Sequence, residues 1–380
     1  MLLIFPSICA RNCFFQIVRL SYHKKQFSNS NFVNFFKNKL YNCFFCPIIY
    51  KNKLISFNLL YKNLQEDTMA KNKLAKIAFF SATTITTIHV VNRIMNYLAV
   101  SKDVLTTKPG EFYDWKYGKV YYEQHGEGSP LLLLHSLEVG GNADEWSHIV
   151  SQLAKKHTVY TVDLPGCGRS EKSLTTYTNF VYIRFLADFI NAVICEPTAM
   201  IANAESCPLA MMLHKYNPTF ISDLTLVNPP SIKEASQSVT FIDKLKKWIL
   251  DTPILGSLLY QLHYRENMIS KRLAADGFYD ARLIPSNFIA SYYKGTHLGK
   301  SQGRFLASSI DAHYIHVPLA KLVQELPENT RVLLGTFHKN ANCISKEYLL
   351  YYSNISTKLI PNTKKYPHFE APAEFLRKLN

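Results

Sequence analysis

"PTAMIANAESCPLAMMLHKYNP", residues 197–218, combines a strand, a tight turn and a helix in direct succession. The run "AMIANA" is apolar, as in a strand buried on both faces of a sheet. Small residues fill the turn, and an apolar pattern with helical spacing begins near Cys207. Pro208 is compatible with a helix that begins there, because proline is tolerated in the first helical turn. A buried strand that leads directly into a helix is typical of a parallel α/β sheet.

The same alternation of strands and helices extends to both sides of this stretch. Buried strands are expected in "PLLLLHS" (130–136), "HTVYTVDLPGCGRS" (157–170), "SDLTLVNPP" (222–230), "TRVLLGTF" (330–337) and "STKLIP" (356–361). Helical patterns separate them, and "GKVYYEQHGEG" (118–128) has the alternation of an antiparallel hairpin. The sequence therefore predicts an α/β fold with a mostly parallel central sheet and helices on both faces.

The strand pattern lapses for about a hundred residues between Pro230 and Thr330. This stretch has helical periodicity, including an amphipathic run that Pro253 interrupts. A helical insertion here, at about 231–329, is expected to cover the carboxyl edge of the strands as a cap. Open α/β sheets bind their ligands at that edge, so the sequence predicts a pocket beneath the cap.

The composition is that of a globular protein, because 47% of the residues are apolar and 19% are charged. The net charge of +15 is uneven, since residues 1–68 hold nine basic and two acidic side chains. No basic run beyond them alternates with aromatic residues on one face, so no nucleic-acid partner is predicted. "CFFC" at 43–46 lacks a second cysteine pair or a histidine cluster, and neither a metal nor a cofactor is predicted.

The first 68 residues show no sustained helical or strand periodicity. Gln65, Glu66 and Asp67 can be encoded by codons that contain a bacterial ribosome-binding sequence, a few bases before the codon of Met69. Our hypothesis is that translation starts at Met69 and that residues 1–68 are a non-native or disordered leader.

Three lysines follow Met69, and a largely uncharged stretch comes after them. This pattern resembles an uncleaved signal-anchor, so we expect residues 69–100 to form a membrane-anchor helix with 77–100 in the bilayer. A single-pass anchor of this kind places the domain at 101–380 on the non-cytoplasmic side. An amphipathic helix that lies on the membrane or packs on the domain is the alternative.

Four motifs at characteristic spacings carry a resemblance to a known family. They are "LLLLHS" at 131–136, "EW" at 145–146, "DLPGCGRS" at 163–170 and "YPHFEAP" at 366–372. With them, residues 110–380 resemble the α/β-hydrolase superfamily, of the esterase, haloperoxidase and peptidase type. The resemblance implies the α/β-hydrolase fold, a serine on a sharp turn after a strand, a histidine and a carboxylate.

None of the three catalytic positions that the resemblance implies holds the expected residue. The nucleophile position is Ala204, the acid position is His338 and the histidine position is Lys365. An alanine methyl cannot attack a carbonyl, and a lysine here is expected to find a partner such as Glu205 or to point to solvent. The oxyanion loop and pocket are expected to include Ser136, Leu137, Glu205 and Cys207.

A turn shifted by two residues would place Ser206 as the nucleophile and His368 as its base. The alternative roles are a helix cap for Ser206 and a structural hydrogen bond for His368. Two functions therefore stay open. The first is a membrane-anchored, catalytically degenerate protein that binds an apolar small molecule, a lipid or a protein partner under its cap. The second is an active serine hydrolase of the esterase or acyl hydrolase type.

Overall fold

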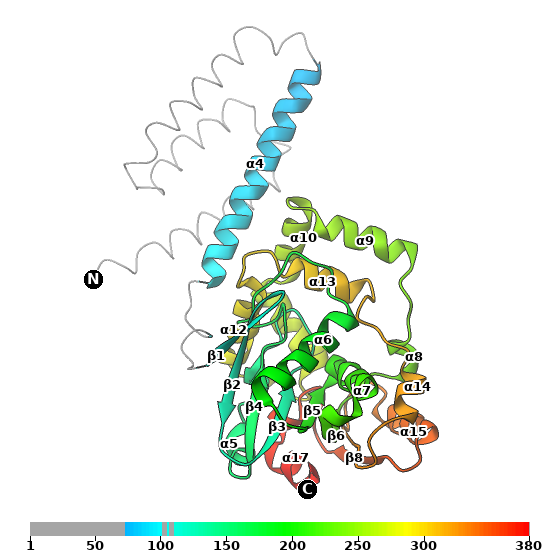
Figure 1. The fold of residues 1–380 in the computed structure, drawn as a ribbon. Helices are drawn as coiled ribbons and strands as arrows, with labels where there is room; N and C mark the ends of the chain where they lie inside the picture. The colour runs from blue at the N-terminus through cyan, green and yellow to red at the C-terminus, as the bar shows by residue number, and fades with distance from the viewer. Residues whose placement is uncertain (1–72, 101–104, 106–109, 380) are drawn as a thin grey trace, which may run out of the picture. The chain divides into compact units, whose positions relative to one another are not determined.

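The computed structural model describes residues 73–100, 105 and 110–379 (Figure 1). The chain divides into two units, Met1–Thr83 and Thr84–Asn380, and the second contains the sheet and the cap. The hypothesis on residues 1–68 lies outside the described residues.

Helix α4 (Lys73–Val100) occupies most of the predicted anchor segment. Within 73–100, 105 and 110–379, no helix combines the length and the apolarity that crossing a membrane requires. Threonines and Arg93 interrupt the apolar run of α4, which lowers its hydropathy. The predicted span through residues 77–100 is therefore not supported, although the segment is helical.

Eight strands form one sheet in the order β1-β2-β4-β3-β5-β6-β7-β8. The strands are β1 (Glu111–Trp115), β2 (Gly118–His125), β3 (Ser129–Leu134), β4 (His157–Val162), β5 (Thr198–Asn203), β6 (Ile221–Val227), β7 (Arg331–Gly335) and β8 (Ser356–Ile360). β2 pairs with β1 and β4 in the antiparallel sense, and the pairs from β4 to β8 are parallel. The predicted α/β fold with a mostly parallel sheet is confirmed.

The central strands are apolar because both of their faces are covered. Leu131–Leu134 of β3 are all buried, and Leu132 lies opposite Tyr160 of β4 and Met200 of β5. Alternate side chains of a strand enter the cores on opposite faces of the sheet, so all four positions from Leu131 to Leu134 require apolar residues.

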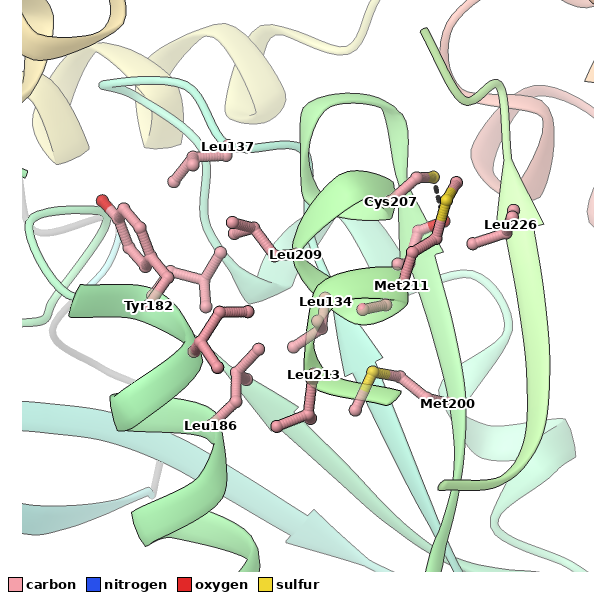
Figure 2. Close-up of a cluster of buried hydrophobic side chains, with 14 of the residues drawn as sticks. Leu134, Leu137, Tyr182, Leu186, Met200, Cys207, Leu209, Met211, Leu213 and Leu226 are labelled. Carbon is pink, nitrogen blue, oxygen red and sulfur yellow. Dashed lines mark hydrogen bonds between the residues drawn. The ribbon is translucent and has the colours of Figure 1, made fainter. Parts of the chain in front are cut away.

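Helices cover both faces of the sheet (Figure 1). Apart from α4 and the helices between β6 and β7, they are η1 (Ala143–Trp146), α5 (Val150–Leu153), α6 (Asn179–Phe189), η2 (Ile190–Ile194), η3 (Ala204–Ser206), α7 (Cys207–Tyr216), η4 (Pro218–Phe220), α15 (Ala341–Tyr351), α16 (Pro367–Glu370) and α17 (Pro372–Leu379). Figure 2 shows Leu209 and Leu213 of α7 packed beside Tyr182 and Leu186 of α6. On the other face, Trp146 and Phe375 contribute to a second core.

The segment between β6 and β7 is a helical insertion, as predicted. It contains α8 (Ile232–Ala235), α9 (Phe241–Asp251), α10 (Leu255–His263), α11 (Glu266–Arg272), η5 (Leu273–Gly277), η6 (Ala281–Leu283), α12 (Ser286–His297), α13 (Arg304–Asp311) and α14 (Leu319–Gln324). We call α9–α13 the cap. Backbone N–H of Lys365 donates to the carbonyl of Gly277 over 2.9 Å, which ties the cap to the loop after β8.

A buried ion pair holds the glycine-rich loop that follows β4. The carboxylate of Asp163, which has no exposed surface, accepts hydrogen bonds from Ala143 N at 2.7 Å and from Arg169 N at 2.7 Å. Arg169 Nε adds a third bond at 2.8 Å. Burial alone would raise the pKa of Asp163, but Arg169 holds it below its usual value. The loop is therefore fixed around a charged pair inside the protein.

Candidate functional site

The turn after β5 has the backbone of a strained elbow. Ala204, the first residue after the strand, has φ +49°, a conformation that residues with a Cβ seldom adopt. It costs roughly 1 kcal/mol for an alanine, and such strain is concentrated at functional sites. The resemblance places the nucleophile at this residue. The backbone geometry of the elbow is present, but its side chain is a buried methyl group.

Glu205 and Lys365 form an ion pair next to this elbow. Lys365 Nζ lies 3.1 Å from a carboxylate oxygen of Glu205 and also contacts Glu138. The Glu205 carboxylate accepts a further hydrogen bond, at 2.7 Å, from Ser136 Oγ in the loop after β3. The pairing expected for Lys365 therefore forms. Carboxylates from the elbow and the β3 loop hold Lys365, which the resemblance places at the catalytic histidine position.

Each charged group of this pair stabilises the ionised form of the other. Burial alone would lower the pKa of Lys365, but Glu138 and Glu205 raise it well above its usual value. Burial alone would also raise the pKa of Glu205, and Lys365 and the Ser136 hydroxyl lower it instead. Lys365 thus stays a cation at neutral pH. An ammonium that never loses its proton cannot serve as the general base of a hydrolase.

His338 follows β7, where the resemblance places the catalytic carboxylate. Its backbone N–H donates to the carbonyl of Gly335 over 3.0 Å, and its Nδ1 has no hydrogen-bond partner among the described residues. Burial, and then the charge of Lys365, lower its pKa to about 4. The imidazole is therefore neutral, so it does not supply the negative charge that would stabilise a histidine cation.

Asn228 positions the Lys365 loop. It follows β6 with φ +47°, and its Nδ2 donates to the carbonyls of Lys364 at 2.8 Å and Lys365 at 3.1 Å. Its Oδ1 accepts the backbone N–H of Gly335 at 2.9 Å. One amide thus joins the ends of β6 and β7 to the loop after β8. No pattern in the sequence indicates this role for Asn228.

The structure does not bring Ser206 and His368 together by a hydrogen bond. Ser206 Oγ donates to the backbone carbonyl of His135 at 2.5 Å and is fully buried. The residue holds the N-cap position of α7, but its side chain makes no capping bond. His368 is also fully buried and stacks on Trp146, with ring centroids 3.9 Å apart. In this geometry neither side chain reaches the cavity described below.

The four expected pocket residues have different surroundings. Leu137 and Glu205 line the cavity beneath the cap. The backbone N–H of Ser136 donates to Glu145 Oε1 at 3.0 Å, which occupies one donor of the oxyanion loop. The thiol of Cys207 points into the core, where its Sγ lies 3.2 Å from the carbonyl of Ala202 (Figure 2). Burial raises the pKa of that thiol far above its usual value.

A buried polar cluster beneath the elbow was missed by sequence reasoning. Glu145 accepts hydrogen bonds from Ser136 N and from Asn203 Nδ2, the latter at 2.9 Å, and lies 3.6 Å from His368 Nε2. Burial raises the pKa of Glu145 to about 8 and lowers that of His368 far below its usual value. Both groups are therefore neutral at pH 7. The only signal in the sequence was the glutamate of the "EW" motif. No periodicity in the sequence indicated that this side chain is buried.

We expect Glu145 to make stability depend on pH. Its pKa is about 8 in the folded protein and near 4.5 when exposed, so the folded state binds this proton more tightly. The resulting stabilisation is complete below about pH 4.5 and is lost as the pH rises through 8. Glu145→Gln mimics the protonated acid. Between pH 5 and pH 8, the unfolding free energy of the wild type should fall by about 3 kcal/mol relative to the variant.

Urea denaturation at several pH values measures this difference. Comparison with the variant cancels the titration of the other buried groups, including the histidines, which shift stability in the opposite sense. Parallel pH profiles for the two proteins would show that Glu145 is ionised in the folded state.

A cavity of about 270 Å³ lies between the sheet edge and the cap. The loop at 137–140 lines one side, Glu205, Lys365 and Tyr366 line the base, and α10–α13 with η5 close the other side. Ile269, Leu273 and Ile310 give its wall an apolar part, whereas Arg272 adds a cation and Asp276 and Asp311 add acidic side chains. The lining includes Glu205 but not Ala204, so the ion pair faces the space in which a substrate carbonyl would lie.

The comparisons with known proteins agree with this architecture. A model of the alpha/beta hydrolase fold family matches residues 129–312. A serine hydrolase involved in carbazole degradation has a solved structure that superimposes with a TM-score of 0.57 at 16% identity, over 71% of this chain and 96% of that chain. The chain has the α/β-hydrolase fold, and residues 129–312 belong to the alpha/beta hydrolase fold family.

Several curated relatives of this chain, though not all of them, are hydrolases or esterases by name. The "Putative carbamate hydrolase RutD" of Azorhizobium caulinodans is 32% identical over 109 residues, which is 29% of this chain and 40% of the relative. The pimeloyl-[acyl-carrier protein] methyl ester esterase of Proteus mirabilis is 44% identical over 54 residues, 14% of this chain and 20% of the relative. The chain thus spans less than half the length of these relatives.

Proposed function

We propose that this α/β-hydrolase chain is catalytically degenerate and binds a small molecule in the cavity beneath its cap. The observation that carries the proposal is Ala204, which occupies a strained elbow with φ +49° but has no nucleophilic atom. Loss of a triad member typically lowers kcat by roughly four to six orders of magnitude. A protein that keeps the elbow and the pocket of this fold but lacks the nucleophile can still bind a small molecule.

The ion pair of Glu205 and Lys365 supports the same conclusion. In a hydrolase of this fold, the backbone N–H after the nucleophile stabilises the oxyanion. Here the residue after Ala204 is Glu205, and its carboxylate accepts the hydroxyl of Ser136 and the ammonium of Lys365. A carboxylate and an ammonium held beside these donors fill the space that a substrate carbonyl would need. The arrangement therefore disfavours acyl transfer even with an external nucleophile.

The cavity defines the chemistry of the proposed ligand. Its volume of about 270 Å³ is close to the lower end of small-molecule sites, which are roughly 300–1,000 Å³. The apolar wall from Ile269, Leu273 and Ile310 suits an aliphatic or aromatic body, and the polar side chains of the lining, Arg272 among them, suit a polar end. We infer a small, largely apolar molecule with one polar group. An attachment to a membrane through residues 69–100 is not part of the proposal.

The dye 1-anilinonaphthalene-8-sulfonate, an apolar anion, tests the cavity. We expect it to bind the full-length protein, and Ile310→Trp should weaken binding about tenfold because the larger side chain fills the wall of the cavity. Leu350→Trp is the matched control, since Leu350 lies on α15 and is 82% exposed. Equal dye affinity of the wild type and a folded Ile310→Trp variant would contradict binding in the cavity.

The active esterase remains the second candidate, favoured by the names of the curated relatives. It requires Ser206 Oγ to leave the carbonyl of His135 and meet His368. The replacement Ser206→Ala separates the two proposals, because it abolishes activity only in the esterase.

A further inference from the structure

The outer face of the cap exposes a row of large apolar side chains. On α9, Phe241 is 81% exposed, Trp248 67%, Ile242 62% and Leu245 47%. Their spacing of one, four and seven residues places them on one side of the helix. In Figure 1, α9 and α10 lie on the outside of the cap, away from the sheet. We call these four side chains and the exposed Leu255, Leu259 and Leu262 of α10 the cap patch.

Lysines flank this apolar face on both sides. At 100° per residue, Lys244 follows one edge of the apolar arc and Lys246 follows the other. Both are exposed, whereas Lys247 is turned inward and pairs with Asp251 at 2.8 Å. Long lysine stems can cover apolar surface while the ammonium groups reach toward polar headgroups.

The acidic residues of α9 are engaged with the protein. Asp243 is buried and caps the helix; its carboxylate accepts the backbone N–H and the hydroxyl of Thr240 and also lies 3.7 Å from Lys246 Nζ, which remains exposed. Asp251 accepts Ser308 Oγ at 2.7 Å in addition to Lys247. The outward face of α9 therefore combines apolar side chains with positive charge.

We propose that the cap patch docks on the surface of an anionic lipid bilayer. A strongly amphipathic helix of low net hydrophobicity, with Trp, Phe and Leu on one face and lysines beside it, is the pattern of helices that lie in the membrane interface. The proposal concerns a surface outside the cavity, so it does not depend on the proposed ligand. In this arrangement the cap, which covers the edge of the sheet, lies next to the lipid.

The positive charge beside the cap patch argues against two other binding partners, namely a second copy of the chain and the chain's own residues 1–68. In a symmetric dimer through α9, the flanking lysines of the two copies would face each other. Residues 1–68 of the same chain carry nine basic and two acidic side chains, so they would also bring like charge to the patch. An anionic surface complements the lysines, and apolar acyl chains complement the residues between them.

Trp248 provides a local reporter in the full-length protein. The chain has three tryptophans, and the other two, Trp115 and Trp146, are buried. Vesicles of equal parts phosphatidylglycerol and phosphatidylcholine should shift the emission of Trp248 to the blue, and brominated acyl chains should quench it. Trp248→Phe should lose both effects. Because the signal comes from α9, membrane binding by the N-terminal residues cannot produce it.

Matched variants locate the contact. Phe241→Glu should weaken the vesicle affinity reported by Trp248 about tenfold, because it puts a carboxylate into the apolar face. Phe180→Glu is the control, since Phe180 is 71% exposed on α6, outside the patch. Neutral phosphatidylcholine vesicles should give a weaker shift.

Three results would overturn the proposal. The first is the absence of a shift and of quenching with anionic vesicles. The second is a Trp248 emission that is already blue without vesicles, which would show that another part of the chain or a second copy covers the patch. The third is a shift caused by polyglutamate but not by vesicles, which would assign the patch to an acidic protein.

Discussion

Joint replacement of Ala204 by serine, His338 by aspartate and Lys365 by histidine is expected to create esterase activity toward p-nitrophenyl butyrate. The backbone elbow is already present at Ala204, and the Lys365→His change also removes the cation that holds Glu205. A triad assembled on an existing oxyanion loop should raise kcat/KM at least about 100-fold over the wild type. This gain in kcat/KM is small compared with the roughly 10⁴-fold or larger loss of rate that follows removal of a triad residue from an optimised enzyme.

The double variant His338→Asp, Lys365→His is the matched control, because it has the same charge changes without the nucleophile. It should remain as inactive as the wild type, and release of p-nitrophenolate measures all three proteins. If the double and triple variants hydrolyse the ester equally, Ala204 does not occupy the nucleophile position.

Arg169→Met is expected to lower the unfolding free energy by about 3–5 kcal/mol. The substitution leaves the carboxylate of Asp163, which has no exposed surface, without its cation. Arg169 also pairs with Asp144 at 3.2 Å, so the loss affects the β4 loop and η1 together. Thermal denaturation should show a midpoint lower by about 10 °C.

Arg184→Met is the control for this effect. Arg184 is 67% exposed and pairs with Asp188 at 3.1 Å on the surface of α6, where solvent screens the two charges and the pair contributes little to stability. Equal destabilisation by the two variants would show that the Asp163 pair is not the origin of the loop's stability.

Much of the fold could be predicted because buried strands have a distinctive composition. The run from Leu131 to Leu134 is apolar at every position, which occurs where both faces of a strand are covered. The cap was predictable for the opposite reason, since no such run occurs between Pro230 and Thr330. Local periodicity therefore located the sheet edge and the insertion above it.

The contacts of the site depend on positions that are far apart in the sequence. Sequence reasoning anticipated Glu205 as a partner of Lys365 but not the contact with Glu138, because that contact requires the actual path of the β3 loop. The pairing of Glu145 with Asn203 and His368 was missed for the same reason. Burial of a carboxylate is a tertiary property, and no local pattern in the chain reports it.

The central claim is that no activated serine occupies this site, and a fluorophosphonate tests it most directly. The reagent forms a phosphorus–oxygen bond with an activated serine hydroxyl and releases fluoride, so each labelled protein gains the mass of one phosphonyl group. The account predicts that the intact mass of the wild-type protein stays unchanged, while the triple variant gains one group at residue 204. A phosphonyl group on Ser206 of the wild type, lost in Ser206→Ala, would contradict it.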